Sequence, residues 1–263
     1  MAWNPDQYLK FSEPRLRPAV DLLARVAVTA PKFVHDLGCG AGNVTRLLAE
    51  RWPEASITGV DDSAEMLAQA ARDLNAVTWI RQSLADWAPA QPADVIFSNA
   101  ALHWLPRHEQ LFPRLLGYLA PGGVLAVQMP RNFSAPSHSL IAETVRHGAW
   151  RDKLEHLLRP VPVAEPRDYY ATLEPLAESI DIWETEYLQI LQGIDPVKEW
   201  TKGTWLKQFV DELDESERTE FEADYARRLR IAYPPMKDGK TLFPFRRLFM
   251  VVHKAGHVPR PAN

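Results

Sequence analysis

The fold is decided by the stretch Val34-His35-Asp36-Leu37-Gly38-Cys39-Gly40-Ala41-Gly42-Asn43-Val44-Thr45. A short apolar run leads into three alternating glycines, and a helix-forming stretch follows them. Glycine tolerates the conformations of a tight turn and leaves no side chain between the backbone and a ligand. The stretch therefore predicts a strand, a glycine-rich turn and a helix, with a flat ligand lying against the turn.

The spacing of these glycines differs from the Gly-x-Gly-x-x-Gly fingerprint of dinucleotide-binding proteins. The third position of that fingerprint is occupied by Asn43, and the glycine comes one place early, at Gly42. Asp36, two residues before the first glycine, would repel a pyrophosphate and suits a ligand that carries an ammonium group. Asp61, nineteen residues after Gly42, closes the second expected strand, where an acid accepts hydrogen bonds from ribose hydroxyls.

Around this stretch, short β-branched runs alternate with amphipathic stretches up to about residue 129. This alternation is typical of repeated βαβ units and a mainly parallel sheet. Strands are expected at residues 33–37, 56–60, 77–81, 94–99 and 124–129. Helices are expected at residues 43–51, at 64–74 behind Ser63 as N-cap, at 107–119, and ahead of the first strand at about 16–27. The fold class is α/β, with a Rossmann-like, doubly wound sheet.

The pattern changes from about residue 130. One helix is expected at residues 137–158, a strand at 182–191, further helices over 195–233 and a last strand at 242–253. Asp214 and Glu217 have the spacing of a capping box. We expect a single domain over residues 1–263, with a cofactor-binding core at about 30–130 and a helical lid at about 195–236.

Composition and charge exclude several classes of protein. The 263 residues include 30 Lys and Arg against 34 Asp and Glu, a net charge of −4, so no global charge favours nucleic acid. The single cysteine, Cys39, cannot form an intramolecular disulfide or a thiolate metal site. The sequence shows neither a signal peptide nor an apolar run of about 18 residues. We therefore expect a cytoplasmic protein that binds no metal, no nucleic acid and no membrane.

The glycine turn and Asp61 resemble the first motif and its acidic successor in the class I S-adenosylmethionine-dependent methyltransferase family. Residues 82–87, 97–100 and 119–124 resemble further motifs of that family, in the same order. The resemblance implies S-adenosylmethionine as cofactor and a seven-stranded sheet whose last strand is antiparallel. The cofactor-binding residues that it implies are Tyr8, Asp36, Gly38, Cys39, Gly40, Gly42, Asp61, Asp62, Asp86, Trp87 and Asn99. The thiol of Cys39 is expected to be a small packed group rather than a nucleophile.

Residues 3–9, 101–104 and 241–247 are similar to the trans-aconitate 2-methyltransferase family, and this likeness covers the full chain. It implies an acceptor with three carboxylates, which arginine suits because its planar guanidinium forms two parallel hydrogen bonds with a carboxylate. Arg228 and Arg246 are further candidates, and Arg246 and Arg247 must point to opposite sides of their strand. The expected acceptor-binding residues are His103, Trp104, Arg131, Arg227 and Arg247.

Three functions stay open at this point. The first is methyl transfer to a carboxylate of a small organic acid such as trans-aconitate, which needs no general base because a carboxylate is ionised at pH 7. The second is O-, N- or C-methylation of an aromatic or apolar acceptor, with His103 as the catalytic base. The third is a non-catalytic regulatory module that only binds the cofactor. The residues leave the oligomeric state open.

Overall fold

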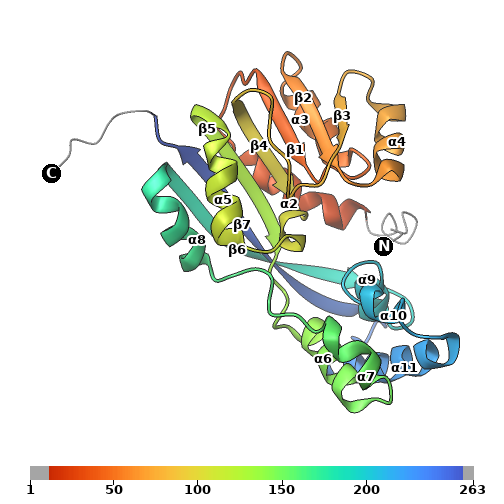
Figure 1. Ribbon diagram of the computed structural model, residues 1–263. Helices are drawn as coiled ribbons and strands as arrows, with labels where there is room; N and C mark the ends of the chain where they lie inside the picture. Colours follow the sequence, from red (N-terminus) through yellow and green to blue (C-terminus); the bar gives the residue numbers. More distant parts are fainter. Residues whose placement is uncertain (1–11, 257–263) are drawn as a thin grey trace. The chain divides into compact units, whose positions relative to one another are not determined.

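The computed structural model describes residues 12–256, which divide into two compact units (Figure 1). The sheet unit comprises residues 16–130, 163–185 and 248–256. The helical unit comprises residues 131–162 and 186–247, together with residues 12–15. Among the described residues, no helix is long and apolar enough to cross a membrane.

A seven-stranded sheet in the order β3-β2-β1-β4-β5-β7-β6 forms the sheet unit. Its strands are β1 Phe33–Leu37, β2 Ser56–Asp61, β3 Thr78–Arg81, β4 Ala93–Asn99, β5 Leu119–Pro130, β6 Ala177–Leu191 and β7 Thr241–Lys254. The first five strands pair in parallel, and β7 runs antiparallel, which confirms the expected topology. The chain of β6 continues into the helical unit, and β7 returns from it.

The central strands β4 and β5 are buried on both faces over most of their length, as parallel strands usually are, whereas the edge strand β3 is largely exposed. Val95, Ile96 and Phe97 of β4 are fully buried, although they point to alternating sides of the sheet. The helices and turns of this unit are α2 Ser12–Ala24, α3 Asn43–Arg51, α4 Ala64–Asp73, η1 Leu102–Trp104, α5 His108–Gly117, α8 Pro166–Leu173 and η3 Glu174–Leu176. The expected N-cap of α4 is confirmed, because the Ser63 side chain accepts a hydrogen bond from the Met66 backbone.

The helical unit has a hydrophobic core of its own, with Trp150, Phe209, Phe221 and Tyr225 among its buried side chains. Its elements are α6 Pro136–His147, α7 Arg151–Leu154, η2 Glu155–Leu157, α9 Pro196–Lys202, α10 Lys207–Val210 and α11 Glu215–Ala232. Asp214 and Glu217 form the expected capping box at the start of α11. The expected lid residues 195–236 lie within this unit, and their role as a lid stays a prediction.

The expectation of one helix over residues 137–158 is wrong. Helix α6 ends at His147 because the Trp150 indole folds back and donates its Nε1–H to the Thr144 carbonyl at 2.9 Å. A Cβ at Gly148 would lie 2.1 Å from this ring, so only glycine fits at the break. Helix α8 was missed altogether, and β5 begins at Leu119, five residues before its expected start.

Candidate active site

The glycine turn joins β1 to α3 and is bound to the end of β2. The backbone N–H groups of Gly38 and Cys39 both donate to the Val60 carbonyl, at 2.8 and 3.1 Å. Gly38, Gly40 and Gly42 have φ values of 75°, 53° and 80°, a left-handed region that other residues rarely adopt. The three glycines are therefore required by the backbone path itself.

The space around these glycines is not uniform. A Cβ at Gly38 would lie 2.1 Å from Cβ of Ala101, and one at Gly42 would lie 3.0 Å from the Trp79 ring. At Gly40, by contrast, nothing lies within 4 Å of such a Cβ. The turn is therefore closely packed at both ends and open in the middle, where a ligand can lie directly against the backbone.

Asp61 ends β2 and binds the middle of the turn. Its Oδ2 accepts the Gly40 N–H at 2.9 Å, and its Oδ1 accepts the Ser63 N–H at the same distance. Burial raises the pKa of this carboxyl, and the two backbone donors oppose that rise. A carboxylate offers about four lone-pair positions, so Asp61 keeps acceptor capacity for two ribose hydroxyls.

Asp36 lies in β1 and is 1% exposed. Its Oδ2 accepts a hydrogen bond from the Thr45 hydroxyl of α3 at 2.6 Å. Burial raises the pKa of Asp36 to about 7, the Thr45 hydrogen bond opposes the rise, and the nearby charge of Asp61 adds to it. A cationic group of a ligand near this carboxyl would stabilise its ionised form.

Asn99 is the last residue of β4 and lies opposite Gln128 of β5 in the parallel register. Its side-chain Oδ1 is buried and has no hydrogen-bond partner among the described residues. Buried polar atoms are nearly always hydrogen-bonded, so this oxygen is an acceptor that lacks its hydrogen-bond donor. Ligands of open α/β sheets bind at the carboxyl ends of the strands, where Asn99 lies. The turn, the two acids and this oxygen fit a nucleoside cofactor that carries an ammonium group.

Other expected cofactor residues have different surroundings. Cys39 is buried, and burial raises the pKa of its thiol far above the usual range, which agrees with a packed group. Asp62 and Asp86 are exposed. The Trp87 side chain is 1% exposed and packs edge-on against His35 at 5.2 Å, and its expected contact with the cofactor stays a prediction. Tyr8 lies outside the described residues.

Two residues that pack around the glycine turn were not predicted from the sequence. Thr45 holds Asp36, and its signal was a hydroxyl residue in the first turn of the helix that follows the glycines. Gly59 of β2 makes room for Trp79 and Cys39, because a Cβ there would lie 2.3 Å from the indole and 3.1 Å from the sulfur. A glycine within a buried strand is the corresponding sequence signal.

The expected acceptor residues are divided between the two units. His103 and Trp104 lie in η1 of the sheet unit, with their rings 4.8 Å apart; His103 is buried and Trp104 is 45% exposed. Arg131 and Arg247 belong to the helical unit. Arg247 is 5% exposed and its guanidinium lies 4.8 Å from the centre of the Phe245 ring.

The two arginines of β7 confirm the expected alternation. Arg246 is exposed and pairs with Glu186 at 3.8 Å, whereas Arg247 is buried. The backbone N–H of Arg131 donates to the Arg246 carbonyl at 3.0 Å. Arg131, which directly follows β5, is therefore hydrogen-bonded to β7.

The expected role of Arg227 in acceptor binding stays a prediction, and its surroundings favour a surface ion pair. This arginine and Arg228 both bind the Asp224 carboxylate, and Arg228 also lies 3.5 Å from Glu143. Together they hold the pKa of Asp224 below its usual range, against the effect of its burial. The charges of both arginines are thus matched by acids of α6 and α11, and Arg227 takes part in an ion pair on the α11 surface.

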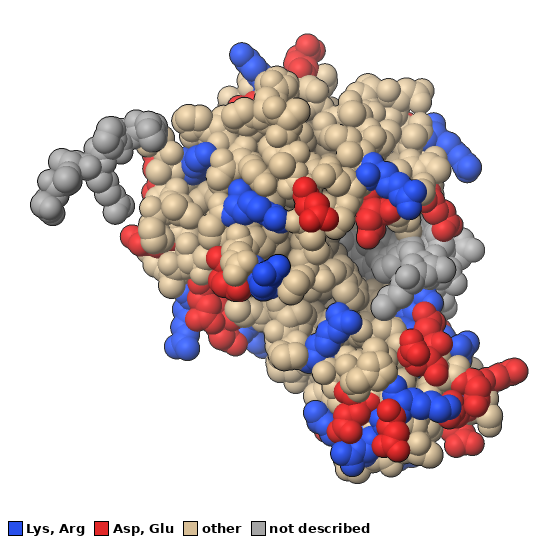
Figure 2. Space-filling view, in the orientation of Figure 1, with Lys and Arg blue, Asp and Glu red and all other residues tan. Residues whose placement is uncertain are grey.

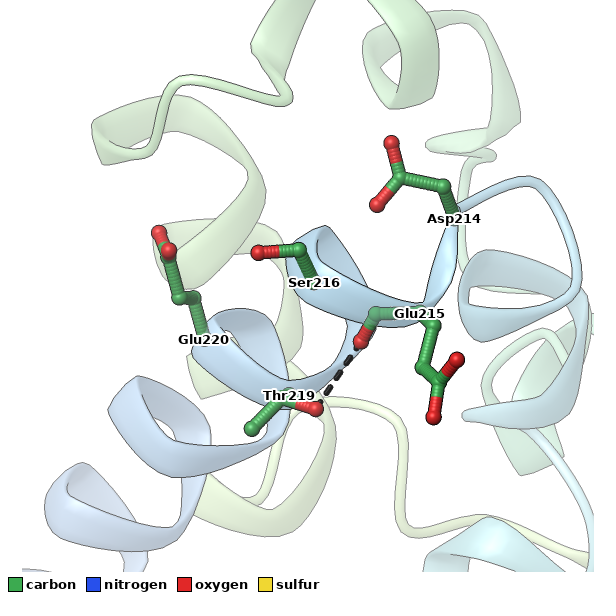
Figure 3. A pocket seen from close by; sticks show the side chains of 5 residues that line it. All are labelled: Asp214, Glu215, Ser216, Thr219 and Glu220. Carbon is green, nitrogen blue, oxygen red and sulfur yellow. Dashed lines mark hydrogen bonds between the residues drawn. The ribbon is translucent and has the colours of Figure 1, made fainter.

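Two hollows of the helical unit do not suit an acidic acceptor. Figure 3 shows one at the start of α11, lined by Asp214, Glu215, Ser216, Thr219 and Glu220. Acidic side chains there complement the positive end of the helix dipole, and they would repel a carboxylate. The other is a cavity of about 100 Å³ with mostly apolar walls, in which burial lowers the pKa of His138 to about 4 and Arg159 is the cation. A single cation cannot match three carboxylates.

The face drawn in Figure 2 and the described metal-ligating residues indicate no further site. On the face drawn in Figure 2, basic and acidic side chains are interspersed rather than gathered by sign. Within residues 12–256, no group of three or more His, Cys, Asp or Glu is placed to hold a metal ion.

Comparison with known proteins agrees with this geometry. A family model described as a methyltransferase domain matches residues 34–123, from β1 to the start of β5. A phosphoethanolamine N-methyltransferase of Haemonchus contortus, solved with phosphomonomethylethanolamine and S-adenosylhomocysteine, has a TM-score of 0.55 at 15% identity. The alignment covers 91% of this chain and about half (52%) of that one, and it shows the fold. Fold and site together define a class I S-adenosylmethionine-dependent methyltransferase.

Relatives with much higher identity are also known. Trans-aconitate 2-methyltransferase of Azoarcus sp. is 47% identical over 249 residues, which cover 95% of this chain and 98% of the relative. The enzyme of the same name from Streptomyces avermitilis is 47% identical over 262 residues, covering 96% and 97%. The chain belongs to the trans-aconitate 2-methyltransferase family.

Proposed function

We propose that this protein transfers the methyl group of S-adenosylmethionine to a carboxylate oxygen of trans-aconitate. The products are a monomethyl ester and S-adenosylhomocysteine. The observation that carries the proposal is the 47% identity, along 95% of the chain, to relatives that are named for this acceptor. We also propose that the protein works in the cytoplasm, in keeping with its single free cysteine.

Residues of the sheet unit hold the cofactor in this proposal. The backbone at Gly40 lies against it, Asp61 accepts from the ribose hydroxyls and Asp36 faces the ammonium group. Asn99 directs its buried Oδ1 to the reacting end of the cofactor. When bound, S-adenosylmethionine supplies an electrophilic methyl group on a positively charged sulfur.

The protein does not have to remove a proton from the acceptor. A carboxylate is ionised at pH 7, so no side chain has to act as a general base. The residues then act by positioning the two reactants and excluding water, which can contribute about 7–11 kcal/mol. His103 becomes essential only for the alternative acceptors, whose hydroxyl, amine or carbon must lose a proton.

The charge of the acceptor requires cations. Taking carboxylates out of water is costly unless they are paired, and the cofactor carries only one sulfonium. We propose Arg131 and Arg247 for this role. Arg131 follows three residues after Gln128, the register partner of Asn99, and Arg247 is held in place by burial beside Phe245. Residues 195–236, proposed as a lid, would contribute to the choice of acceptor.

Incubation with radiolabelled S-adenosylmethionine and a panel of acceptors tests the proposal. Trans-aconitate should give a monomethyl ester, identified by mass spectrometry, in preference to mono- and dicarboxylates. Arg247→Met should raise KM for trans-aconitate by roughly tenfold to a hundredfold, the scale of a lost hydrogen bond to a charged group. Arg227→Met is the matched control and should leave KM unchanged, because Arg227 is paired with Asp224.

The alternatives predict other results. Methylation of aromatic or apolar acceptors but of no organic acid, with loss of activity in His103→Asn, would show a base-assisted enzyme. Cofactor binding without turnover on any acceptor would show a regulatory module.

A further inference from the structure

A buried hydrogen-bonded pair in the sheet unit has no part in the proposed chemistry. His108 of α5 and Tyr169 of α8 are both buried, and the His108 Nδ1 lies 2.6 Å from the Tyr169 hydroxyl. The other ring nitrogen, Nε2, lies 3.0 Å from the carbonyl oxygen of Leu102. The pair thus connects two helices to the first residue of η1.

The partners determine where the protons are. A carbonyl oxygen only accepts, so Nε2 of His108 carries the proton and donates it to Leu102. In the neutral ring Nδ1 is then an acceptor, and the Tyr169 hydroxyl donates to it. The Tyr169 oxygen in turn accepts the Ala164 N–H at 3.3 Å. These three hydrogen bonds form a relay in which every donor points the same way, from the Ala164 N–H through Tyr169 and His108 to the Leu102 carbonyl.

The element at the end of this relay is a short turn, which is joined to the rest of the sheet unit by burial of Leu102 and His103 and by the relay. η1 has three residues, and its backbone bonds run from Trp104 to Ala101 at 3.1 Å and from Leu105 to Leu102 at 3.0 Å. Short 3₁₀ turns have poor hydrogen-bond geometry and depend on outside contacts. The Leu102 carbonyl accepts both the bond from Leu105 and the bond from His108, so the relay binds η1 at its first residue.

η1 lies between features of the candidate site. It is preceded by Asn99, by Ala100 with a positive φ of 55°, and by Ala101, which closes the space next to Gly38. It carries His103 and Trp104, the two residues of the sheet unit that are expected to bind the acceptor. A shift of η1 would therefore move His103 and Trp104, whereas the backbone hydrogen bonds that bind the glycine turn to Val60 would remain.

We propose that His108 and Tyr169 are positioning residues for methyl transfer, which hold η1 in the orientation that turnover requires through the bond to the Leu102 carbonyl. The inference rests on the proposed function and on the expected contact of Trp104 with the acceptor, because the orientation of η1 limits turnover only if Trp104 meets the acceptor. The competing explanation is that the pair only packs α5 against α8, together with Phe112, whose ring lies 5.0 Å from that of Tyr169.

Two amide substitutions at one position separate these explanations. In His108→Gln the side-chain amide can reach the place of Nε2 and donate to Leu102. In His108→Asn the amide reaches only the place of Nδ1, so the bond to Tyr169 is kept and the bond to Leu102 is lost. Both replace the ring by a neutral amide, so both lose the ring packing against Phe112.

Turnover is the first readout. We expect His108→Asn to lower kcat for trans-aconitate by about tenfold to a hundredfold, the scale of a small misplacement in an active site, and His108→Gln to restore most of it. The dissociation constant for S-adenosylhomocysteine should stay within about threefold of wild type in both, because the cofactor's own ligands are intact. Tyr169→Phe, which removes only the hydroxyl, should give a smaller loss of kcat. A loss that follows the fall in melting temperature equally in all three variants would overturn the proposal.

The second readout does not need activity. Protein labelled with 5-fluorotryptophan gives a ¹⁹F resonance for Trp104, identified by its absence in Trp104→Phe. This resonance should shift or broaden in His108→Asn and return toward the wild-type position in His108→Gln. An unchanged resonance in both His108→Asn and Tyr169→Phe would overturn the role of the relay, even if trans-aconitate is not the acceptor. Absence of methyl transfer by the wild-type protein would instead contradict the proposed function.

Discussion

Replacing Asp36 by Asn removes one negative charge next to the glycine turn and changes the shape of the side chain very little. The oxygen of the introduced amide would still accept the Thr45 hydroxyl, which lies 2.6 Å from the carboxylate in the native chain. Burial raises the pKa of Asp36 from 3.8 to about 7. A carboxyl whose pKa is raised on folding favours the native state only while it is protonated, so it destabilises the fold as the pH rises from about 4 to about 7.

The size of this effect follows from the two pKa values. At about 1.4 kcal/mol per pKa unit, the ionised carboxyl lowers the free energy of unfolding by on the order of 4 kcal/mol at pH 8. Asp36→Asn should therefore stabilise the ligand-free protein at pH 8, by roughly 5–10 °C in melting temperature if most of that energy is recovered. At pH 4 the gain should vanish. Glu178→Gln removes an exposed charge on β6 and is the control that should show neither change.

Asp36→Asn should weaken cofactor binding, although it should stabilise the ligand-free protein. A ligand ammonium near Asp36 favours the ionised carboxyl, so binding at pH 7 should release about half a proton. Titration calorimetry with S-adenosylhomocysteine in phosphate and in Tris would detect this as a binding enthalpy that depends on the buffer. Asp36→Asn should abolish the dependence and weaken binding by about 1–3 kcal/mol. A buffer-independent enthalpy in the wild type, with unchanged affinity in the variant, would refute the role given to Asp36.

The remaining predictions concern other sites. Asp61→Ala should weaken binding of S-adenosylhomocysteine by about 1–3 kcal/mol, measured by calorimetry; unchanged affinity would remove Asp61 from the cofactor site. Asp214→Ala should lower the free energy of unfolding by about 1 kcal/mol in urea titrations, and Asp214→Ser should restore it, because only the latter keeps the cap of α11. His103→Asn should keep much of the activity toward trans-aconitate, and the wild-type rate should be nearly flat between about pH 6.5 and 8.5; a steep pH profile lost in the variant would indicate a general base.

The sequence was informative wherever local rules determine the structure. Strand β1 and helix α3 have the expected bounds, because the glycines between them mark the end of one element and the start of the next. The caps at Ser63 and Asp214 were likewise correct, since a cap depends on residues only three positions apart. The family resemblance supplied the antiparallel last strand, which no local pattern reveals.

The sequence was less informative where distant residues decide the structure, and two local patterns were overlooked. Whether the Trp87 indole faces a ligand or the core depends on His35 and Tyr118, which lie far away in the sequence. Helix α8 was missed although it begins at Pro166, and proline is common at the first position of a helix. The pairing of Arg227 with Asp224 was within reach, because acids three residues before an arginine on a helix lie on the same face.

The two acids of the glycine turn explain why this fold selects its class of cofactor. Burial raises the pKa values of both Asp36 and Asp61, so each is destabilised as an anion in the ligand-free protein. The groups seen to oppose this rise are neutral donors: the Thr45 hydroxyl for Asp36, and the N–H groups of Gly40 and Ser63 for Asp61. Hydrogen bonds of this kind leave the negative charge in place. A ligand with an ammonium and a sulfonium group relieves that charge, whereas a dinucleotide pyrophosphate would increase the repulsion. The charge of the turn therefore favours S-adenosylmethionine over a dinucleotide, although both cofactors are bound by glycine-rich turns of this kind.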